Sequence, residues 1–168
     1  MSVLATVDVR SGPPLVLREA VRADVPVLVA LLARDQLGAG RDGIADAADL
    51  AAYEAAFAEI DRDPAHVLVV AETADGTVAG TMQLSVLPGL ARRGSRRAQI
   101  EAVRVAESHR GQGLGSAMLG WAVAEAARRG CALVQLTTDK SRPDAHRFYE
   151  RLGFVASHEG MKLGLSPG

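Results

Sequence analysis

A run of alternate glycines between a predicted strand and a predicted helix carries the clearest chemical signal in this sequence. Gly111, Gly113 and Gly115 lack a Cβ, so the backbone can turn tightly there and come close to a bound anion. The helix expected after them begins with unpaired N–H groups and the positive end of its macrodipole. Arg110 adds a cation suited to phosphate oxygens. The pattern therefore predicts a phosphate or pyrophosphate site, whereas isolated glycines would indicate only a tight turn.

Two better-known phosphate motifs do not fit this run. A P-loop requires Lys and then Ser or Thr after its last glycine, but Ser116 follows Gly115 directly and no Lys is present. A dinucleotide-binding loop starts at the very end of its strand, whereas residues 106–109 intervene here. The motif Gly-x-Gly-x-x-Gly also requires a last glycine where this chain, counted from Gly113, has Met118. Nucleoside triphosphate hydrolysis and dinucleotide binding are therefore disfavoured.

Two motifs, separated by a predicted helix and a predicted strand, carry a family resemblance. The first is Val103-Arg104-Val105 followed by Arg110-Gly111-Gln112-Gly113-Leu114-Gly115-Ser116. The second is Ala145-His146-Arg147-Phe148-Tyr149-Glu150-Arg151-Leu152-Gly153-Phe154. In order and spacing they resemble the signatures of the GNAT superfamily, the acyl-CoA-dependent N-acetyltransferases, and the resemblance covers residues 15–165. It implies acetyl-CoA as the acyl donor and direct attack by an amine. It also implies an α/β fold, with a mixed, mainly antiparallel β-sheet flanked by helices.

The resemblance also implies which residues hold the donor. The main chain of Val103 and Val105 is expected along the pantetheine and the thioester, with the Val105 N–H near the thioester oxygen. Residues 110–116 are expected around the diphosphate. Many relatives carry Asn where this chain has Arg142, which can donate the same hydrogen bond or reach a cofactor phosphate. The remaining expected donor contacts are Arg104, Ala145 and Phe148.

Tyr149 is the candidate general acid. On the predicted helix, Ala145, Phe148 and Leu152 form a buried stripe, and Tyr149 lies at its edge. A phenol with a pKa of about 10 can protonate a leaving thiolate, because the thiol pKa is about 8.5. The alternative is a half-buried tyrosine with a structural role.

Glu101 is the candidate general base. Strand alternation places Glu101, Val103 and Val105 on one face, so the acid shares the face expected to carry the donor. A base that accepts the ammonium proton is worth roughly 10²–10⁴ in rate. A solvated or salt-bridged strand acid is the alternative.

Hydrophobic periodicity and turn residues predict the elements that position these groups. Residues 1–13 are expected to form a flexible tail, and residues 14–168 one domain. Strands are predicted over 15–20, 66–72, 77–87, 98–105, 132–138, 154–158 and 161–165. Helices are predicted from 25 until Gly38–Gly43, from 47 until Pro64, over 113–129 and over 143–153.

Composition narrows the class of protein. The 168 residues allow one well-buried core, and a net charge of −1 gives no general attraction to nucleic acid. A single cysteine, Cys131, fits a reducing compartment, and no apolar run approaches the ~20 residues that span a bilayer. The four histidines are scattered, so no metal site is expected. We expect a cytoplasmic protein without a membrane or nucleic-acid partner; homodimerisation is plausible from the resemblance.

The acceptor site implied by the resemblance comprises residues 36–58 and 157–161. The four acids of residues 36–58 can favour a cationic amine, or they can simply cap and solvate a helix: Asp42, Asp46, Asp49 and Glu54. The connection is long enough to cover a pocket, which favours a small-molecule amine as acceptor. A protein amine, a non-catalytic acyl-CoA-sensing domain and a purely structural dimer module remain as alternatives.

Overall fold

The structure, a computed structural model, describes residues 2–34 and 40–165. The chain divides into two compact units, Met1–Gln135 and Leu136–Gly168. The strands are β1 (Val3–Val7), β2 (Leu15–Glu19), β3 (His66–Glu72), β4 (Val78–Leu87), β5 (Arg96–Val105) and β6 (Cys131–Leu136). The helices are α1 (Val25–Ala33), α2 (Ala47–Arg62), α3 (Ala91–Gly94), α4 (Leu114–Arg128) and α5 (Pro143–Arg151), with the 3-10 turns η1 (Arg22–Asp24) and η2 (Glu107–His109).

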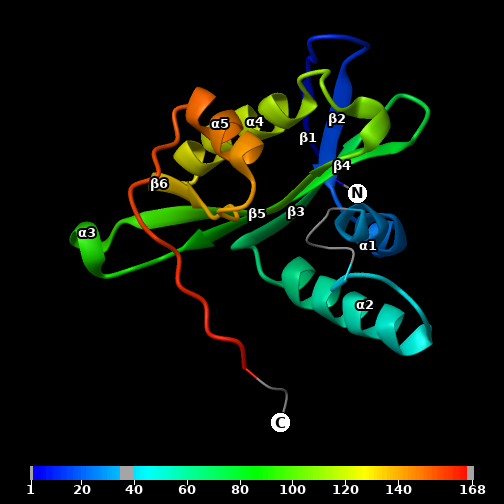
Figure 1. Ribbon diagram of the computed structural model, residues 1–168, viewed down its shortest axis with the longest axis horizontal. Coiled ribbons are helices and arrows are strands. Elements are labelled where there is room, and N and C mark those ends of the chain that lie inside the picture. The colour runs from blue at the N-terminus through cyan, green and yellow to red at the C-terminus, as the bar shows by residue number, and fades with distance from the viewer. Residues whose placement is uncertain (1, 35–39, 166–168) are drawn as a thin grey trace. The chain divides into compact units, whose positions relative to one another are not determined.

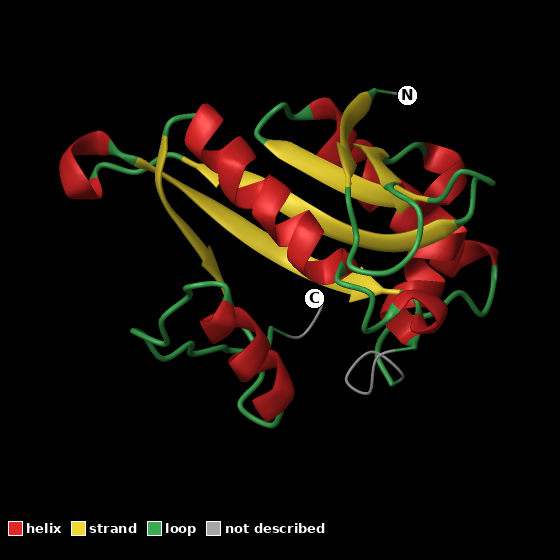
Figure 2. Cartoon of the chain, turned by 90° about the horizontal axis from the view of Figure 1, so that it is seen from above, coloured by secondary structure: helices red, strands yellow, loops and turns green. Residues whose placement is uncertain are grey.

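The strands form one sheet in the order β1-β2-β3-β4-β5-β6, so strands that follow one another along the chain also lie side by side. Each neighbouring pair from β1 to β5 is antiparallel. Seen from above, the long strands curve together with the twist of the sheet (Figure 2). The predicted mixed, mainly antiparallel sheet flanked by helices is confirmed.

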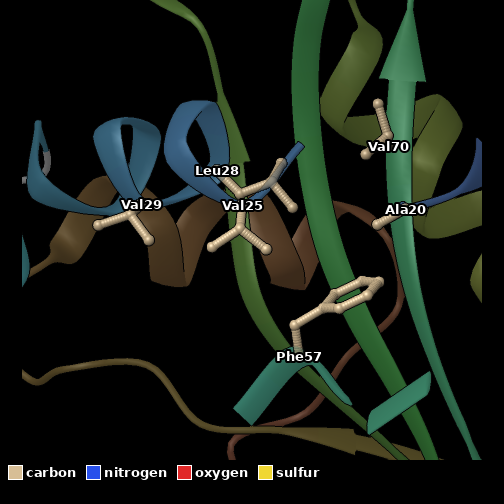
Figure 3. Packing of buried hydrophobic residues seen from close by; sticks show 6 residues of the cluster. All are labelled: Ala20, Val25, Leu28, Val29, Phe57 and Val70. Atoms are coloured by element: carbon tan, nitrogen blue, oxygen red, sulfur yellow. The ribbon is translucent and has the colours of Figure 1, made fainter. Parts of the chain in front are cut away.

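Helices cover both faces of the sheet in the first unit, with α4 on one face and α1 and α2 on the other (Figure 1). Phe57 of α2 packs with residues of α1 and of the sheet (Figure 3). The buried members of this cluster are Ala20, Val25, Leu28, Val29, Phe57 and Val70. Because α1 and α2 share this core, the connection between them is anchored at both ends.

On the opposite face, Gly80 of β4 allows α4 to approach closely. A Cβ at Gly80 would lie 3.1 Å from Met118 Sδ and 3.5 Å from a Leu114 methyl group. It would also lie 2.9 Å from the Arg104 carbonyl oxygen. Met118 and Leu114 are fully buried, so the first turns of α4 pack directly on β4 near its start. This contact fixes the helix whose first residues belong to the glycine run.

A buried ion network ties the start of α1 to the sheet. Arg18 of β2 donates to both carboxylate oxygens of Asp24, at 2.7 and 3.0 Å, and to Glu72 of β3 at 2.7 Å. Asp24 also accepts the Val21 N–H at 2.8 Å. Side-chain exposure is 5% for Arg18 and 10% for Asp24, so the ions depend on one another for solvation.

Three expectations from the sequence need correction or limits. Residues 3–7, predicted within a flexible tail, form β1 because they pair along β2. Residues 154–158 and 161–165, predicted as strands, are irregular and mostly exposed, because their backbone pairs with no strand within their own unit. Residues 36–39 of the expected acceptor segment lie outside the described residues.

No helix among the described residues combines the length and apolar character needed to cross a membrane.

Candidate functional site

The glycine run forms the turn that enters α4. Gly111 and Gly113 adopt left-handed conformations, with φ of 76° and 92°, which residues with a Cβ rarely adopt. Gly113 is the residue directly before α4, and its carbonyl accepts the Ala117 N–H at 3.0 Å. Within the described part of the chain, the backbone N–H groups of residues 111–116 donate to no carbonyl. The loop therefore offers several amide donors at a helix start, as a bound diphosphate requires.

Side chains close this loop from one side. The Arg110 Nε donates to the Val105 carbonyl at 3.4 Å, and the Gln112 side-chain amide donates to the Ser108 carbonyl at 2.9 Å. Arg110 is exposed, so its other guanidinium groups remain accessible to a ligand. Leu114 is buried against the sheet and anchors the first turn of α4. The structure thus holds the end of β5 and the glycine run together.

A β-bulge interrupts β5 next to β4. Thr81 pairs with Arg104 and Gln83 pairs with Glu101, so two residues of β5 stand opposite the single residue between Thr81 and Gln83. The first of these two, Ala102, has a left-handed φ of 54°. A bulge of this kind disrupts the ladder locally and increases the twist. The two strands are therefore not regularly paired at the point where the family resemblance expects the thioester.

The bulge overturns one step of the sequence reasoning. Simple alternation placed Glu101, Val103 and Val105 on one face, but the extra residue shifts the alternation. Glu101 pairs with Gln83, whereas Val105 pairs with Gly80, three residues away along β4. Residues an odd number apart on a strand point to opposite faces. Since Gly80 faces α4, Glu101 is on the face away from α4, and it is exposed.

The same bulge sets the direction of the backbone after it. The Ala106 N–H donates to the Ala79 carbonyl of β4 at 2.8 Å. Successive backbone groups of a strand point alternately to its two edges, so the Val105 N–H points away from β4. Arg104, half-buried, pairs with Thr81 and donates to the Val103 carbonyl at 2.8 Å. The peptide groups of residues 103–105 are thus arranged differently from those of a regular central strand.

In the second unit, α5 carries Tyr149 among aromatic rings. The Tyr149 ring lies edge-on to Phe148 at 5.2 Å and to Phe154 at 5.9 Å between centroids. The Tyr149 carbonyl accepts the Leu152 and Phe154 N–H groups at 3.0 and 3.1 Å, which closes the helix. Tyr149 and Phe148 are both half-buried, as is Ala145 one turn earlier. The predicted buried stripe is not observed among the described residues, because Ala145 and Phe148 are only half-buried and Leu152 is 38% exposed.

Arg142 is the residue directly before α5, and Pro143 occupies the first helical position. The Arg142 carbonyl accepts the Ala145 and His146 N–H groups at 3.1 and 3.2 Å. Asp139 accepts the hydroxyl and the N–H of Ser141 at 2.6 and 2.8 Å, and these bonds hold the pKa of Asp139 below its ordinary value. The turn that presents Arg142 is therefore stabilised by its own side chains.

The four acids of the expected acceptor segment all have structural partners. Asp46 caps α2 by accepting the Ala48 and Asp49 N–H groups at 2.8 and 2.9 Å. Asp49 accepts the Ala45 N–H at 2.9 Å. Asp42 pairs with Arg41 at 3.2 Å, and Glu54 pairs with Arg22 at 2.6 Å, which lowers the pKa of Glu54. For Asp46 the capping alternative is the one observed.

Two features of the site were missed from the sequence. One is the bulge at Ala102, which lies in a strand pattern that also contains Gln99, Glu101 and Arg104, and an alanine there does not indicate a left-handed residue. The other feature is the turn between β1 and β2, where the Arg10 N–H donates to the Gln112 carbonyl at 2.7 Å. Gly12 with Pro13-Pro14 indicates a turn there, but nothing in the sequence shows that the turn meets the glycine run.

Comparison with known proteins agrees with this geometry. The model of the acetyltransferase (GNAT) family matches residues 34–154. Over 60 residues the chain is 45% identical to aminoalkylphosphonate N-acetyltransferase of Salmonella typhimurium, covering 36% of this chain and 39% of the relative. Over 91 residues it is 37% identical to glucosamine 6-phosphate N-acetyltransferase of Trypanosoma brucei brucei, covering 54% of this chain and 59% of the relative. The chain thus spans less than two thirds of the length of either curated relative.

A solved structure matches over a longer stretch. The crystal structure of a transcriptional regulator from Bacillus halodurans is 45% identical and superposes with a TM-score of 0.84. The match covers 90% of this chain and 99% of that one. The family model spans both the bulged strand and the glycine run with its left-handed glycines and unpaired amides. The chain therefore belongs to the acetyltransferase (GNAT) family.

Proposed function

We propose that this enzyme transfers the acetyl group of acetyl-CoA to the primary amine of a small molecule by direct attack. The observation that carries the proposal is the run of unpaired amides at residues 111–116, which follows a bulge in β5. In this assignment the diphosphate is held by residues 110–116 and the pantetheine arm by the main chain of residues 103–105. Further contacts come from Arg142, Ala145 and Phe148.

The Val105 N–H is assigned to the thioester oxygen. Its direction away from β4 supports this role, because a donor committed to the β4 ladder would not be available. A fixed backbone donor stabilises negative charge that develops on that oxygen, and the loss of one such donor typically costs roughly 10²–10³ in rate. Backbone geometry, which depends on Ala102, therefore matters more here than the identity of the valine side chain.

Glu101 is assigned as the base that accepts the ammonium proton. The bulge moves the chain from the face of Glu101 to the face of Val105 within four residues. The Glu101 side chain therefore lies on the face opposite α4, whereas the Val105 N–H lies in the plane of the sheet and points away from β4, so an amine that approaches from the face opposite α4 can reach both. Glu101 is exposed and is open to water, through which a proton can leave.

Tyr149 is assigned as the acid that protonates the leaving thiolate. Its ring is held edge-on by Phe148 and Phe154, which restricts the ring while leaving the hydroxyl as its polar tip. No nucleophilic residue is needed, because the amine attacks the thioester itself.

A small-molecule acceptor is supported by the relatives. Their names specify an aminoalkylphosphonate and glucosamine 6-phosphate, which are both small primary amines that carry a phosphorus oxyanion. The acids of the α1–α2 connection and of α2 described above are engaged in caps and ion pairs, so they do not form a free cluster for a polycationic acceptor.

The catalytic assignments are tested by steady-state release of CoA. Tyr149→Phe should lower kcat by roughly 10²-fold or more while the Kd for CoA stays within about twofold. Glu101→Gln should lower kcat and remove the rise of activity with pH that a base produces. Glu59→Gln, an exposed acid on α2, is the matched control and should leave both constants unchanged. Activity of Tyr149→Phe equal to that of the parent would remove the acid role.

The acceptor class is tested with a panel of amines. It contains an aminoalkylphosphonate, a hexosamine phosphate, the same hexosamine without phosphate, and a peptide with a free N-terminus. Turnover of the small amines with no turnover of the peptide supports the proposal. Turnover restricted to the peptide would overturn it.

A further inference from the structure

The turn between β1 and β2 lies directly against the glycine run. The Arg10 N–H donates to the Gln112 carbonyl at 2.7 Å. A Cβ placed on Gly113 would lie 3.2 Å from the Arg10 nitrogen and 3.3 Å from the Arg10 Cβ. A Cβ on Gly12 would lie 3.7 Å from the side-chain oxygen of Gln112. Two segments more than a hundred residues apart in the sequence thus meet at the donor loop.

This contact determines which way one amide of the loop points. The Gln112 carbonyl and the Gly113 N–H belong to one planar trans peptide group, so they point in opposite directions. Since the carbonyl points toward Arg10, the Gly113 N–H points away from the β1–β2 turn. Among the described residues, that N–H donates to no acceptor. The turn therefore fixes an unpaired donor at the residue directly before α4.

We propose that the β1–β2 turn is a positioning element of the donor site, and that the backbone N–H of Arg10 aligns the Gly113 amide for the diphosphate of acetyl-CoA. A free glycine peptide can rotate easily, because glycine has access to both halves of φ space. The hydrogen bond from Arg10 removes that freedom before the donor binds. The inference rests on the proposed placement of the diphosphate at residues 110–116.

The geometry gives this role to the backbone of residue 10. The Arg10 side chain is exposed and forms no hydrogen bond or ion pair with any described residue. The short approach to Gly113 involves the Arg10 nitrogen and Cβ, which every residue other than glycine has. The effect should therefore follow the N–H group, which proline lacks.

The test compares Arg10→Pro with Arg10→Ala. Both variants lack the guanidinium, and only the alanine variant keeps the N–H. We expect Arg10→Pro to bind CoA at least about tenfold more weakly than Arg10→Ala in calorimetry, the effect of one lost hydrogen bond to a charged group. With S-acetylpantetheine, which has no diphosphate, the two variants should have KM values within about twofold of each other. A general structural defect would instead raise KM for both donors.

A measurement on the parent chain protects the test against misfolding of the proline variant. The amide resonance of Gly113 should shift on addition of CoA, and an unshifted resonance would overturn the inference. Equal affinity of Arg10→Pro and Arg10→Ala for CoA, or equal losses with both donors, would overturn the inference. Calorimetry with CoA needs no amine, so a parent chain that binds CoA but acetylates nothing would refute the proposed function and leave this test intact.

Discussion

The buried network around Arg18 offers a quantitative test of how the fold anchors the start of α1 to the sheet. Asp24→Ala removes two hydrogen bonds from Arg18 and one from the Val21 N–H, and it leaves a guanidinium that is 5% exposed with only Glu72 as a carboxylate partner. Breaking a buried ion pair costs roughly 3–5 kcal/mol. Because Glu72 remains, we expect about 3 kcal/mol of unfolding free energy to be lost.

In a chain of this length, each kcal/mol corresponds to about 2–4 °C, so the melting temperature should fall by about 6–12 °C. Urea denaturation at pH 7 measures the free energy directly. The control is Glu54→Ala, which breaks the ion pair between α2 and the exposed Arg22 and should change stability much less. A loss below about 1 kcal/mol for Asp24→Ala would refute the reasoning, since it would mean that the network contributes no more than a surface pair.

The pH dependence of this loss has a definite sign. Burial acts to raise the pKa of Asp24, and the hydrogen bonds from Arg18 and Val21 outweigh it, so that pKa lies below its ordinary value. The stabilisation is therefore complete above the ordinary carboxyl pKa of about 4 and is lost as the pH falls through the lower pKa of the folded state. The difference between the parent and Asp24→Asn should shrink on acidification. A difference that stays constant from neutral to strongly acidic pH would contradict the assignment.

Three further outcomes are expected. Acetyl-CoA at ~100 times its Kd should stabilise the chain by ~2.7 kcal/mol in thermal melting. Gly113→Ala should abolish most of that gain, because its Cβ would crowd Arg10. Gly111→Ala, whose Cβ meets nothing within 4 Å, should lose less of the gain. Gly80→Val should destabilise the fold and weaken CoA binding together, because its side chain would push against Met118; tight binding in calorimetry would count against the role of this contact. Ala102→Gly should raise the free energy of unfolding by about 1 kcal/mol in urea with activity retained, because glycine relieves the left-handed conformation; a loss of stability would show that φ is not strained there.

Much of the donor site could be predicted because its chemistry requires unusual residues at fixed spacing. Gly111 and Gly113 are needed for left-handed backbone, and that requirement is visible in the sequence. The start of α4 was predicted within one residue for the same reason. A function that requires a particular side chain, or the backbone freedom of glycine, can therefore be recognised from the sequence alone.

The unpredicted parts depend on pairing between distant segments. The bulge at Ala102 arises from register with β4, and alanine has no local preference that would show it. β1 is short and half exposed, so only its ladder with β2 distinguishes it from a tail. The apolar residues of 161–165 alternate as a strand would, but alternation does not provide a partner, and this segment is irregular.

The separation of helices onto the two faces of the sheet has a consequence for how substitutions act. Substitutions in the core beneath α1 and α2 reach Phe57 and Val70, whereas those beneath α4 reach Met118 and Leu114. The intervening strands isolate the two sets of side chains from one another. Under the proposed assignments, a change of acceptor should therefore need substitutions in the layer of α1 and α2 alone, with binding of the acyl donor beside α4 unchanged.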